Sequence, residues 1–236
     1  MNLSHGEAPK HQTPNTKHAA VVWLVRHAEV TTPTLFHGAE SDVELGEHGH
    51  RQAAAAAGWF ATLKPTVVIS SAMRRAVQTA MPIAVSCGVP HLQEPLFHER
   101  LVGPMSGRPH EEFMHIWADT VARWQAGETG FSPPGIESFD AIRDRVLPAF
   151  RRVVEAHPGG RVVIVGHGVM CKVLLLSLLP GHTAADWTRI GRATNLAVSE
   201  LVLEANAWKA RQLLVVPPAV VAVNAAFADG LKKTEA

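Results

Sequence analysis

Two kinds of hydrophobic pattern alternate along this chain. Short runs rich in β-branched residues predict buried strands, at residues 19–25, 66–70, 91–93, 162–165, 196–203 and 212–216. Between them, alanine-rich segments and apolar positions at helical spacing predict helices, at residues 46–63, 73–86, 109–126, 138–157 and 170–179. Strands that alternate with helices predict an α/β fold, here a three-layer α/β/α sandwich around a mostly parallel central sheet.

The two ends of the chain lack this alternation. Residues 1–18 are polar and predict a disordered N-terminal tail, and residues 217–236 pass from an Ala/Val segment into charged residues and predict a C-terminal tail. No repeat and no boundary interrupts the pattern between them. We therefore expect one domain over residues 19–216.

Composition narrows the class of protein. With 236 residues, of which 47% are hydrophobic and 18% charged, the chain can bury a full core. A formal net charge of +1 argues against nucleic acid as a partner. The sequence has no apolar run long enough for a bilayer and no signal-peptide core, and Cys87 and Cys171 cannot make a disulfide framework. We expect a cytoplasmic protein with no membrane partner.

Two predicted strands are followed by a histidine. Arg26 and His27 follow the first strand, and Gly166-His167-Gly168 follows the strand at 162–165. Ligands of open parallel sheets bind beyond the carboxyl ends of the strands. Arginine donates paired hydrogen bonds to a phosphoryl group, and a neutral imidazole can attack phosphorus. A carboxyl group such as that of Glu99, in the loop 94–107, can protonate the leaving oxygen. The pattern therefore favours phosphoryl transfer.

Five motifs occur in a characteristic order. They are Arg26-His27-Ala28, the helix start Ser71-Ala72-Met73-Arg74-Arg75-Ala76-Val77-Gln78-Thr79-Ala80, Glu99 with Gly103 and Gly107, Gly135-Ile136-Glu137-Ser138, and Gly166-His167-Gly168. Over residues 21–203 the chain resembles the histidine phosphatase superfamily, which includes cofactor-dependent phosphoglycerate mutases and many small-molecule phosphatases.

The resemblance implies a role for each matched residue. His27 would be the nucleophile that becomes phosphorylated, and it would bind the phosphoryl oxygens together with Arg26, Arg75 and His167. The helix-start motif assigns the phosphate arginine to Arg75, not to Arg74. Glu99 would be the general acid and then the base that activates water. The catalytic residues implied are thus His27, Glu99 and His167.

The chain departs from the family and mutase patterns in five ways. Ala28 replaces the family glycine, so the backbone there must avoid a left-handed conformation or carry strain. Val30 replaces a threonine, the stretch 30–38 has no asparagine, and His37 stands near the place of an arginine. The segment between Glu99 and His167 is also shorter than in the mutases. These departures favour a phosphatase with a more open or less polar pocket.

We expect the function to be metal-independent hydrolysis of a small phosphorylated metabolite through a phosphohistidine, with inorganic phosphate as product and no cofactor. The alternatives are a cofactor-dependent phosphoglycerate mutase and a non-catalytic phosphate-binding module on the same fold. His110 and His115 are five residues apart, about 140° around a helix, so they cannot form the zinc site of a protease. By position we expect His37 and Arg108 in the substrate pocket, with Phe36, Met105 and Trp117.

Overall fold

A computed structural model describes residues 20–234 and shows a six-stranded sheet in the order β3-β2-β4-β1-β5-β6. The strands are β1 Val21–Arg26, β2 Val67–Ser70, β3 His91–Gln93, β4 Arg161–Gly166, β5 Val198–Glu204 and β6 Ala207–Val215. The first four strands pair in parallel, whereas β5 runs antiparallel to β1 and β6 antiparallel to β5. The predicted α/β class and mostly parallel sheet are confirmed.

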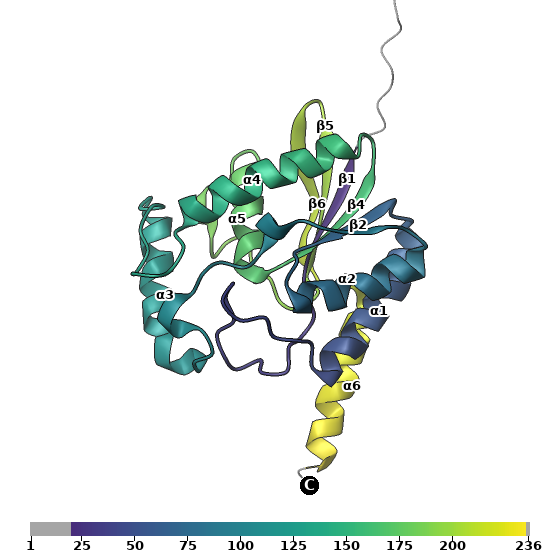
Figure 1. Ribbon diagram of the computed structural model, residues 1–236, viewed down its shortest axis with the longest axis horizontal. Helices are drawn as coiled ribbons and strands as arrows, with labels where there is room; N and C mark the ends of the chain where they lie inside the picture. The colour runs from purple at the N-terminus through teal and green to yellow at the C-terminus, as the bar shows by residue number, and fades with distance from the viewer. Residues whose placement is uncertain (1–19, 235–236) are drawn as a thin grey trace, which may run out of the picture.

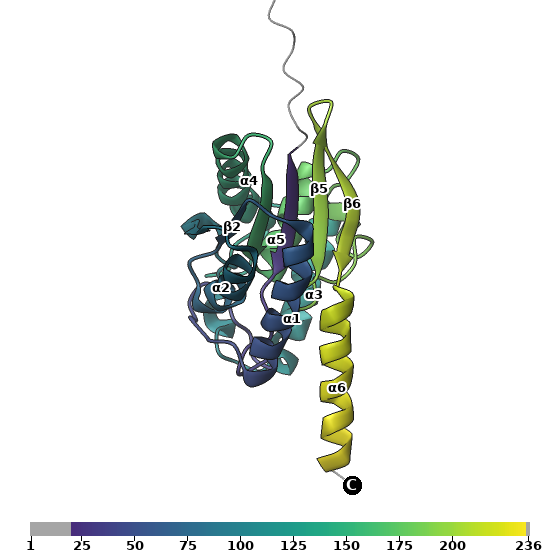
Figure 2. The ribbon, with the colours of Figure 1, turned by 90° about the vertical axis from the view of Figure 1, so that its right-hand side faces the viewer.

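Helices cover both faces of the sheet, which completes the predicted three layers (Figures 1 and 2). One face carries α1, α2 and α6, and the other carries α3, α4 and α5. Their bounds are α1 Glu47–Leu63, α2 Arg74–Cys87, α3 His110–Gln125, α4 Phe139–Ala156, α5 Gly168–Leu178 and α6 Pro218–Thr234. Short 3-10 helices, η1 Pro95–Phe97, η2 Gly103–Met105 and η3 Ala184–Asp186, lie in the connections.

The central strands divide their side chains between two cores. In β1, Val22 and Leu24 pack with α4 and α5, whereas Val21, Trp23 and Val25 pack with α1 and α2. Successive side chains of a strand point to opposite faces, and helices cover both faces of this sheet. This is why the central strands read as continuous apolar runs rather than as alternating ones.

Local signals set several helix ends. Gly88 ends α2 in the left-handed conformation, with φ of 64°, near where the Gly-Val-Pro sequence predicts the end. Ser138 begins α4, and its hydroxyl accepts a hydrogen bond from Ala141 N, as expected of an N-cap serine.

The structure corrects the prediction for the C-terminal end. Residues 217–236 were expected to be a tail, but Pro218–Thr234 form α6. Val220 of α6 is fully buried in the core that α1 and α2 share, and Figure 2 shows the rest of the helix extending past the sheet. Strand β6 also begins at Ala207, five residues before its predicted start. The predicted N-terminal tail, residues 1–18, lies outside the described residues.

Within residues 20–234, no helix combines the length and the hydropathy required to cross a bilayer.

Candidate active site

The sheet brings the two histidine motifs together. Strands β1 and β4 are parallel neighbours, and Arg26 pairs with Gly166, so the next residues, His27 and His167, leave the same edge side by side. Their ring centroids are 5.2 Å apart. Strand β2 lies on the other side of β4 and leads into α2, whose Arg75 Nε donates a hydrogen bond to His167 Nδ1 at 3.2 Å. Residues from three strand ends thus meet at one point.

His27 is buried and neutral. Its Nδ1 lies 2.7 Å from the carbonyl oxygen of Ala28, and because a carbonyl only accepts, Nδ1 carries the proton. The other ring nitrogen, Nε2, therefore keeps its lone pair. Burial, followed by the charges of Arg75 and Arg26, holds the pKa of His27 well below its ordinary value. The imidazole is therefore unprotonated at neutral pH, as a nucleophile must be.

The backbone accommodates Ala28 without strain. Ala28 is not among the non-glycine residues with positive φ, and its side chain is fully buried. Its N–H donates to the hydroxyl of Thr79 at 3.0 Å. The alanine that replaces the family glycine therefore adopts an ordinary conformation.

His167 holds its proton on the opposite nitrogen. Because Arg75 can only donate, His167 Nδ1 is the acceptor and Nε2 carries the proton. This Nε2 has no hydrogen-bond partner among the described residues. Burial and then Arg75 lower the pKa of His167 well below its usual value. The ring thus offers one unused donor beside His27.

Two arginines, the buried Arg75 and the half-buried Arg26, flank this pair. Arg75 is fully buried, and its guanidinium also donates to the carbonyl oxygens of Ser41 and Gly38. Burial lowers the pKa of Arg75 to about 10, against the opposing charge of Glu99, so the side chain stays cationic. Arg26 donates from Nη1 to the carbonyl oxygen of Ala193 at 2.8 Å, and its buried Nε has no partner in the described part of the chain.

Glu99 lies at the N-terminus of α5. Its carboxylate accepts hydrogen bonds from the backbone N–H groups of Arg100, Val169 and Met170 at 2.9 to 3.2 Å. An ion pair between Arg145 and Glu137 fixes the loop that carries it. Arg145 donates to Glu99 O, and Glu137 accepts from Leu101 N. Helix N-termini favour anionic groups, which accounts for the position of this carboxylate.

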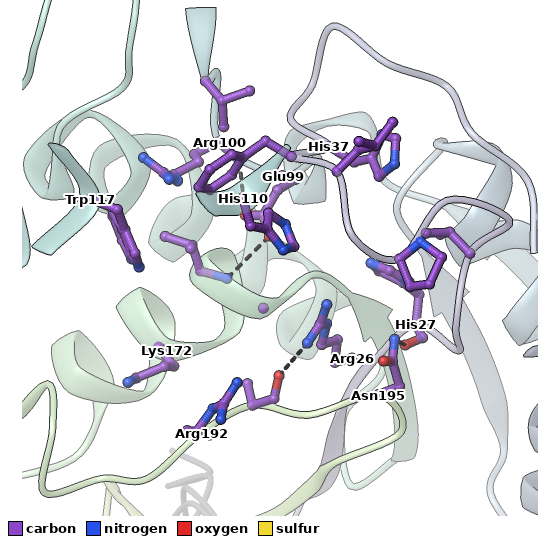
Figure 3. A pocket seen from close by; sticks show the side chains of 18 of the residues that line it. Arg26, His27, His37, Glu99, Arg100, His110, Trp117, Lys172, Arg192 and Asn195 are labelled. Atoms are coloured by element: carbon purple, nitrogen blue, oxygen red, sulfur yellow. Dashed lines mark hydrogen bonds between the residues drawn. The ribbon is translucent and has the colours of Figure 1, made fainter. Parts of the chain in front are cut away.

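A cavity of about 320 Å³ opens beside these residues (Figure 3). Arg26, His27 and Glu99 line it, whereas Arg75 and His167 are fully buried and do not. The lining residues are Arg26, His27, Glu29, Val30, Pro33, Leu35, Phe36, His37, Glu99, Arg100, Val102, His110, Trp117, Gly168, Val169, Lys172, Trp187, Arg192, Ala193 and Asn195.

Some of the predicted pocket residues line the cavity and others do not. His37 lines the cavity, where its ring nitrogens contact Thr32 and Ser41, and Phe36 and Trp117 line it as well. Arg108 does not: its exposed side chain pairs with Glu112. Met105 is buried in a small core cluster outside the cavity lining. Arg108 precedes α3 and forms an i, i+4 ion pair with Glu112 in the first turn of that helix.

Sequence reasoning missed several lining residues. Asn195 donates to His27 O at 3.0 Å, and Arg100, Lys172 and Arg192 add positive charge. Lys172 carried a usable signal, because it is the one charged residue of the otherwise apolar helix α5. Burial, helped by Arg192, lowers the pKa of Lys172 to about 8.

No group of three or more His, Cys, Asp or Glu side chains in residues 20–234 is arranged to hold a metal ion.

Comparison with known proteins identifies the family. The model of the histidine phosphatase superfamily (branch 1) matches residues 22–215. The metal-independent phosphoserine phosphatase of Arabidopsis thaliana is 30% identical over 189 residues, which cover 78% of this chain and 77% of that protein. The probable phosphoglycerate mutase GpmB of Yersinia pestis (strain Pestoides F) is 30% identical over 196 residues, 80% and 87% of the two chains. The chain belongs to the histidine phosphatase superfamily.

Solved structures confirm the histidine phosphatase fold. Bacillus stearothermophilus YhfR matches with a TM-score of 0.75 at 21% identity, over 86% of this chain and all of that one. The native structure of a mycobacterial glucosyl-3-phosphoglycerate phosphatase matches with a TM-score of 0.73 at 24% identity, over 84% and 99% of the chains. The predicted class of enzyme, a phosphoric monoester hydrolase of the histidine phosphatase type, is confirmed by the family match and the curated relatives.

Proposed function

We propose that this histidine phosphatase hydrolyses a small phosphorylated metabolite through a phosphohistidine at His27, without a metal ion. The observation that carries the proposal is the tautomer of His27: Nδ1–H is engaged by Ala28 O, which leaves the Nε2 lone pair of a neutral, buried ring for attack. Arg26 and Arg75 supply the positive charge that a metal would otherwise bring to a phosphoryl group.

In the first step, His27 Nε2 attacks phosphorus. A nitrogen–phosphorus bond forms while the ester phosphorus–oxygen bond breaks, and the leaving oxygen takes a proton from the Glu99 carboxyl. Arg26, Arg75 and the Nε2–H of His167 stabilise the charge that develops on the phosphoryl oxygens. Arg75 and His167 are fully buried and do not line the cavity, so their contact with the phosphoryl group requires local rearrangement beside His27.

In the second step, water attacks the phosphohistidine. Glu99, now a carboxylate, takes a proton from the water while the nitrogen–phosphorus bond breaks. Inorganic phosphate leaves, and His27 returns to its neutral form. The three backbone N–H groups that hold Glu99 fix the position of the carboxylate oxygens that take this proton.

Two features support hydrolysis rather than phosphate transfer between metabolites. Val30, which stands where the mutases carry a threonine, lines the cavity together with Pro33, Leu35 and Phe36, so this wall offers few polar contacts to a second substrate. One curated relative also bears the name of a metal-independent phosphoserine phosphatase. A mutase reaction or simple phosphate binding are the other outcomes of the test below.

The test is to trap the phosphoenzyme. We expect 4-nitrophenyl phosphate to phosphorylate the wild type on His27, detected by mass spectrometry after an alkaline quench, with inorganic phosphate released at the rate of turnover. His27→Ala should remove both signals and lower kcat/KM by roughly 10³- to 10⁶-fold. The matched control, His50→Ala, removes an exposed histidine of α1 and should change neither.

Three results would overturn the proposal. They are near-normal turnover by His27→Ala, a phosphoenzyme on another residue, or stoichiometric phosphate binding without any turnover. A phosphoenzyme that resists water but transfers its phosphoryl group to 3-phosphoglycerate, forming the bisphosphate, would indicate the mutase instead.

We also propose a cytoplasmic location, supported by Cys87 and Cys171, which are both free thiols. Cell fractionation tests it, and recovery of the protein outside the cytoplasm would contradict it.

A further inference from the structure

The cavity extends well beyond the phosphoryl end. Trp117, Lys172, Trp187 and Arg192 line it on the side away from His27, and the same four residues line an adjoining cavity of about 330 Å³. Figure 3 shows Trp117, Lys172 and Arg192 on this far side. If the ester phosphate of a substrate binds at His27, the rest of the substrate would occupy this region.

Lys172 is a buried cation without a counter-ion. Its side chain, on α5, is 8% exposed, and its ammonium group donates one hydrogen bond, to Trp187 O at 2.6 Å. The ammonium also lies 4.2 Å from the centre of the Trp187 ring. No carboxylate of residues 20–234 pairs with it. An ammonium has three donors, so two are left for a ligand.

Arg100 repeats this pattern, and the exposed Arg192 adds a third cation to the same cavity. Arg100 is 3% exposed, stacks 4.0 Å from the centre of the Trp117 ring, and its Nη1 has no hydrogen-bond partner in the described structure. Arg192 lies close enough to Lys172 to lower the pKa of its ammonium group. Neither arginine pairs with a carboxylate of the described chain, whereas arginines such as Arg143 and Arg189 do. Unpaired cations in a partly desolvated pocket are costly, so a ligand anion is the partner that they fit.

The charges lining the cavity exceed what one phosphate ester uses. Four cationic side chains line it, from Arg26, Arg100, Lys172 and Arg192, against the carboxylates of Glu29 and Glu99. Arg26, with Arg75 behind it, suffices for the phosphoryl group. Arg100 and Lys172 each lie over an indole, of Trp117 and Trp187. These two indoles and that of Trp124 pack edge to face, with ring centres 5.4 to 5.7 Å apart, and form one wall.

We propose that Lys172, Arg192 and Arg100 form a second anion subsite, so that the enzyme selects phosphomonoesters that carry another anionic group, a carboxylate or a second phosphoryl group. The inference rests on the proposed function for the orientation of the substrate, with its ester phosphate at His27. It adds a class of substrate and the residues that select it.

The experiment measures binding, so that it does not depend on turnover. The probes are three uncleavable phosphonates: propylphosphonate, 3-phosphonopropanoate and propane-1,3-diphosphonate. Charge-assisted hydrogen bonds contribute about 1.5–3 kcal/mol each. Calorimetry on the wild type should therefore show the two probes with a second anionic group binding about ten- to hundredfold more tightly than propylphosphonate. The carboxylate and diphosphonate arms distinguish which second anion fits better.

Lys172→Met and Arg192→Gln should each reduce, by about tenfold, the ratio of the affinity for the probes with a second anionic group to the affinity for propylphosphonate. Arg192 is exposed, so its variant keeps the test valid if the buried Lys172→Met fails to fold. The control is Arg189→Gln, on the same loop but outside the cavity and paired with Asp186, which should keep the full preference.

Equal affinity of the wild type for the three probes, or an unchanged preference in both variants, would overturn the subsite. Failure of the proposed function is a separate result, since it would appear as probe binding without a phosphohistidine at His27.

Discussion

At the scale of single residues, hydrogen-bond direction decides what each polar side chain can do. A carbonyl oxygen fixes the proton of His27 on Nδ1, and a guanidinium fixes that of His167 on Nε2, although both rings sit at the same sheet edge. The two rings thus present different atoms, a lone pair on His27 Nε2 and an N–H on His167 Nε2. In the proposed mechanism these are the nucleophile and a hydrogen-bond donor. Both roles depend on a neutral ring, which burial among arginines maintains by lowering the pKa of each.

Glu99 is the residue whose role most needs a test. Its carboxyl group, held by three backbone N–H groups, must give a proton in the first proposed step and take one from water in the second. A general acid matters most when the leaving group is poor. We expect Glu99→Gln to slow alkyl phosphates by roughly 10²- to 10⁴-fold and aryl phosphates with good leaving groups much less.

The measurement is steady-state kinetics on both kinds of substrate, with quenched samples for the phosphoenzyme. Without a base for water, phosphohistidine should accumulate on the variant during turnover of 4-nitrophenyl phosphate. Equal slowing of both substrates with no accumulation would assign the proton to another group. His37, which lines the same cavity, would then be the next candidate.

At the scale of elements, α6 is tied to the segment that follows His27. Asn224 of α6 accepts a hydrogen bond from Gln52 Nε2 at 2.8 Å, and Gln52 Oε1 accepts in turn from Glu29 N at 2.9 Å. Phe227 stacks on His48, with ring centres 4.0 Å apart. The last helix therefore contributes to the packing of α1 and, through it, to the loop at the active site.

Removing this contact should weaken the fold measurably. Asn224→Ala leaves the Gln52 amide without a protein acceptor on α6, so we expect the free energy of unfolding to fall by about 1–2 kcal/mol in urea denaturation. Val221→Ala, on the exposed face of the same helix, should change it by less than about 0.5 kcal/mol. Equal changes in the free energy of unfolding for the two substitutions would show that this hydrogen bond does not contribute measurably to stability.

At the scale of the whole molecule, the site joins the sheet edge to the helices on either side, so a bound anion should stabilise the entire fold. A ligand that binds only the folded state at a hundred times its Kd adds about 2.7 kcal/mol. For a chain of this size we expect vanadate to raise the Tm by roughly 5–10 °C. EDTA, added without vanadate, should leave the activity unchanged, because arginines supply the charge.

Differential scanning calorimetry checks this prediction, with nitrate at equal ionic strength as the control. A shift with nitrate as large as with vanadate would indicate a salt effect. Loss of activity in EDTA that one divalent ion restores would contradict the metal-independent mechanism.

Much of this protein follows from its sequence. Short β-branched runs that alternate with helical patterns determine the α/β layers, because strand and helix periodicity are local properties of the chain. The histidine motifs after β1 and β4 also become neighbours as soon as the two strands pair in parallel, and the motif spacing distinguishes Arg75 from Arg74. The sequence predicts a tail where α6 forms, because this helix is stabilised by packing on α1 rather than by its own sequence.

Only the tertiary structure decided the rest of the site. Lys172, Arg100 and Arg192 lie on three different segments, and no spacing along the chain reveals that they share one cavity wall. Arg108 appeared equally suitable, yet it pairs with Glu112 on the surface. Which side chains face a common cavity depends on helix rotation and loop course, and these are set by the packing of residues far apart in the sequence.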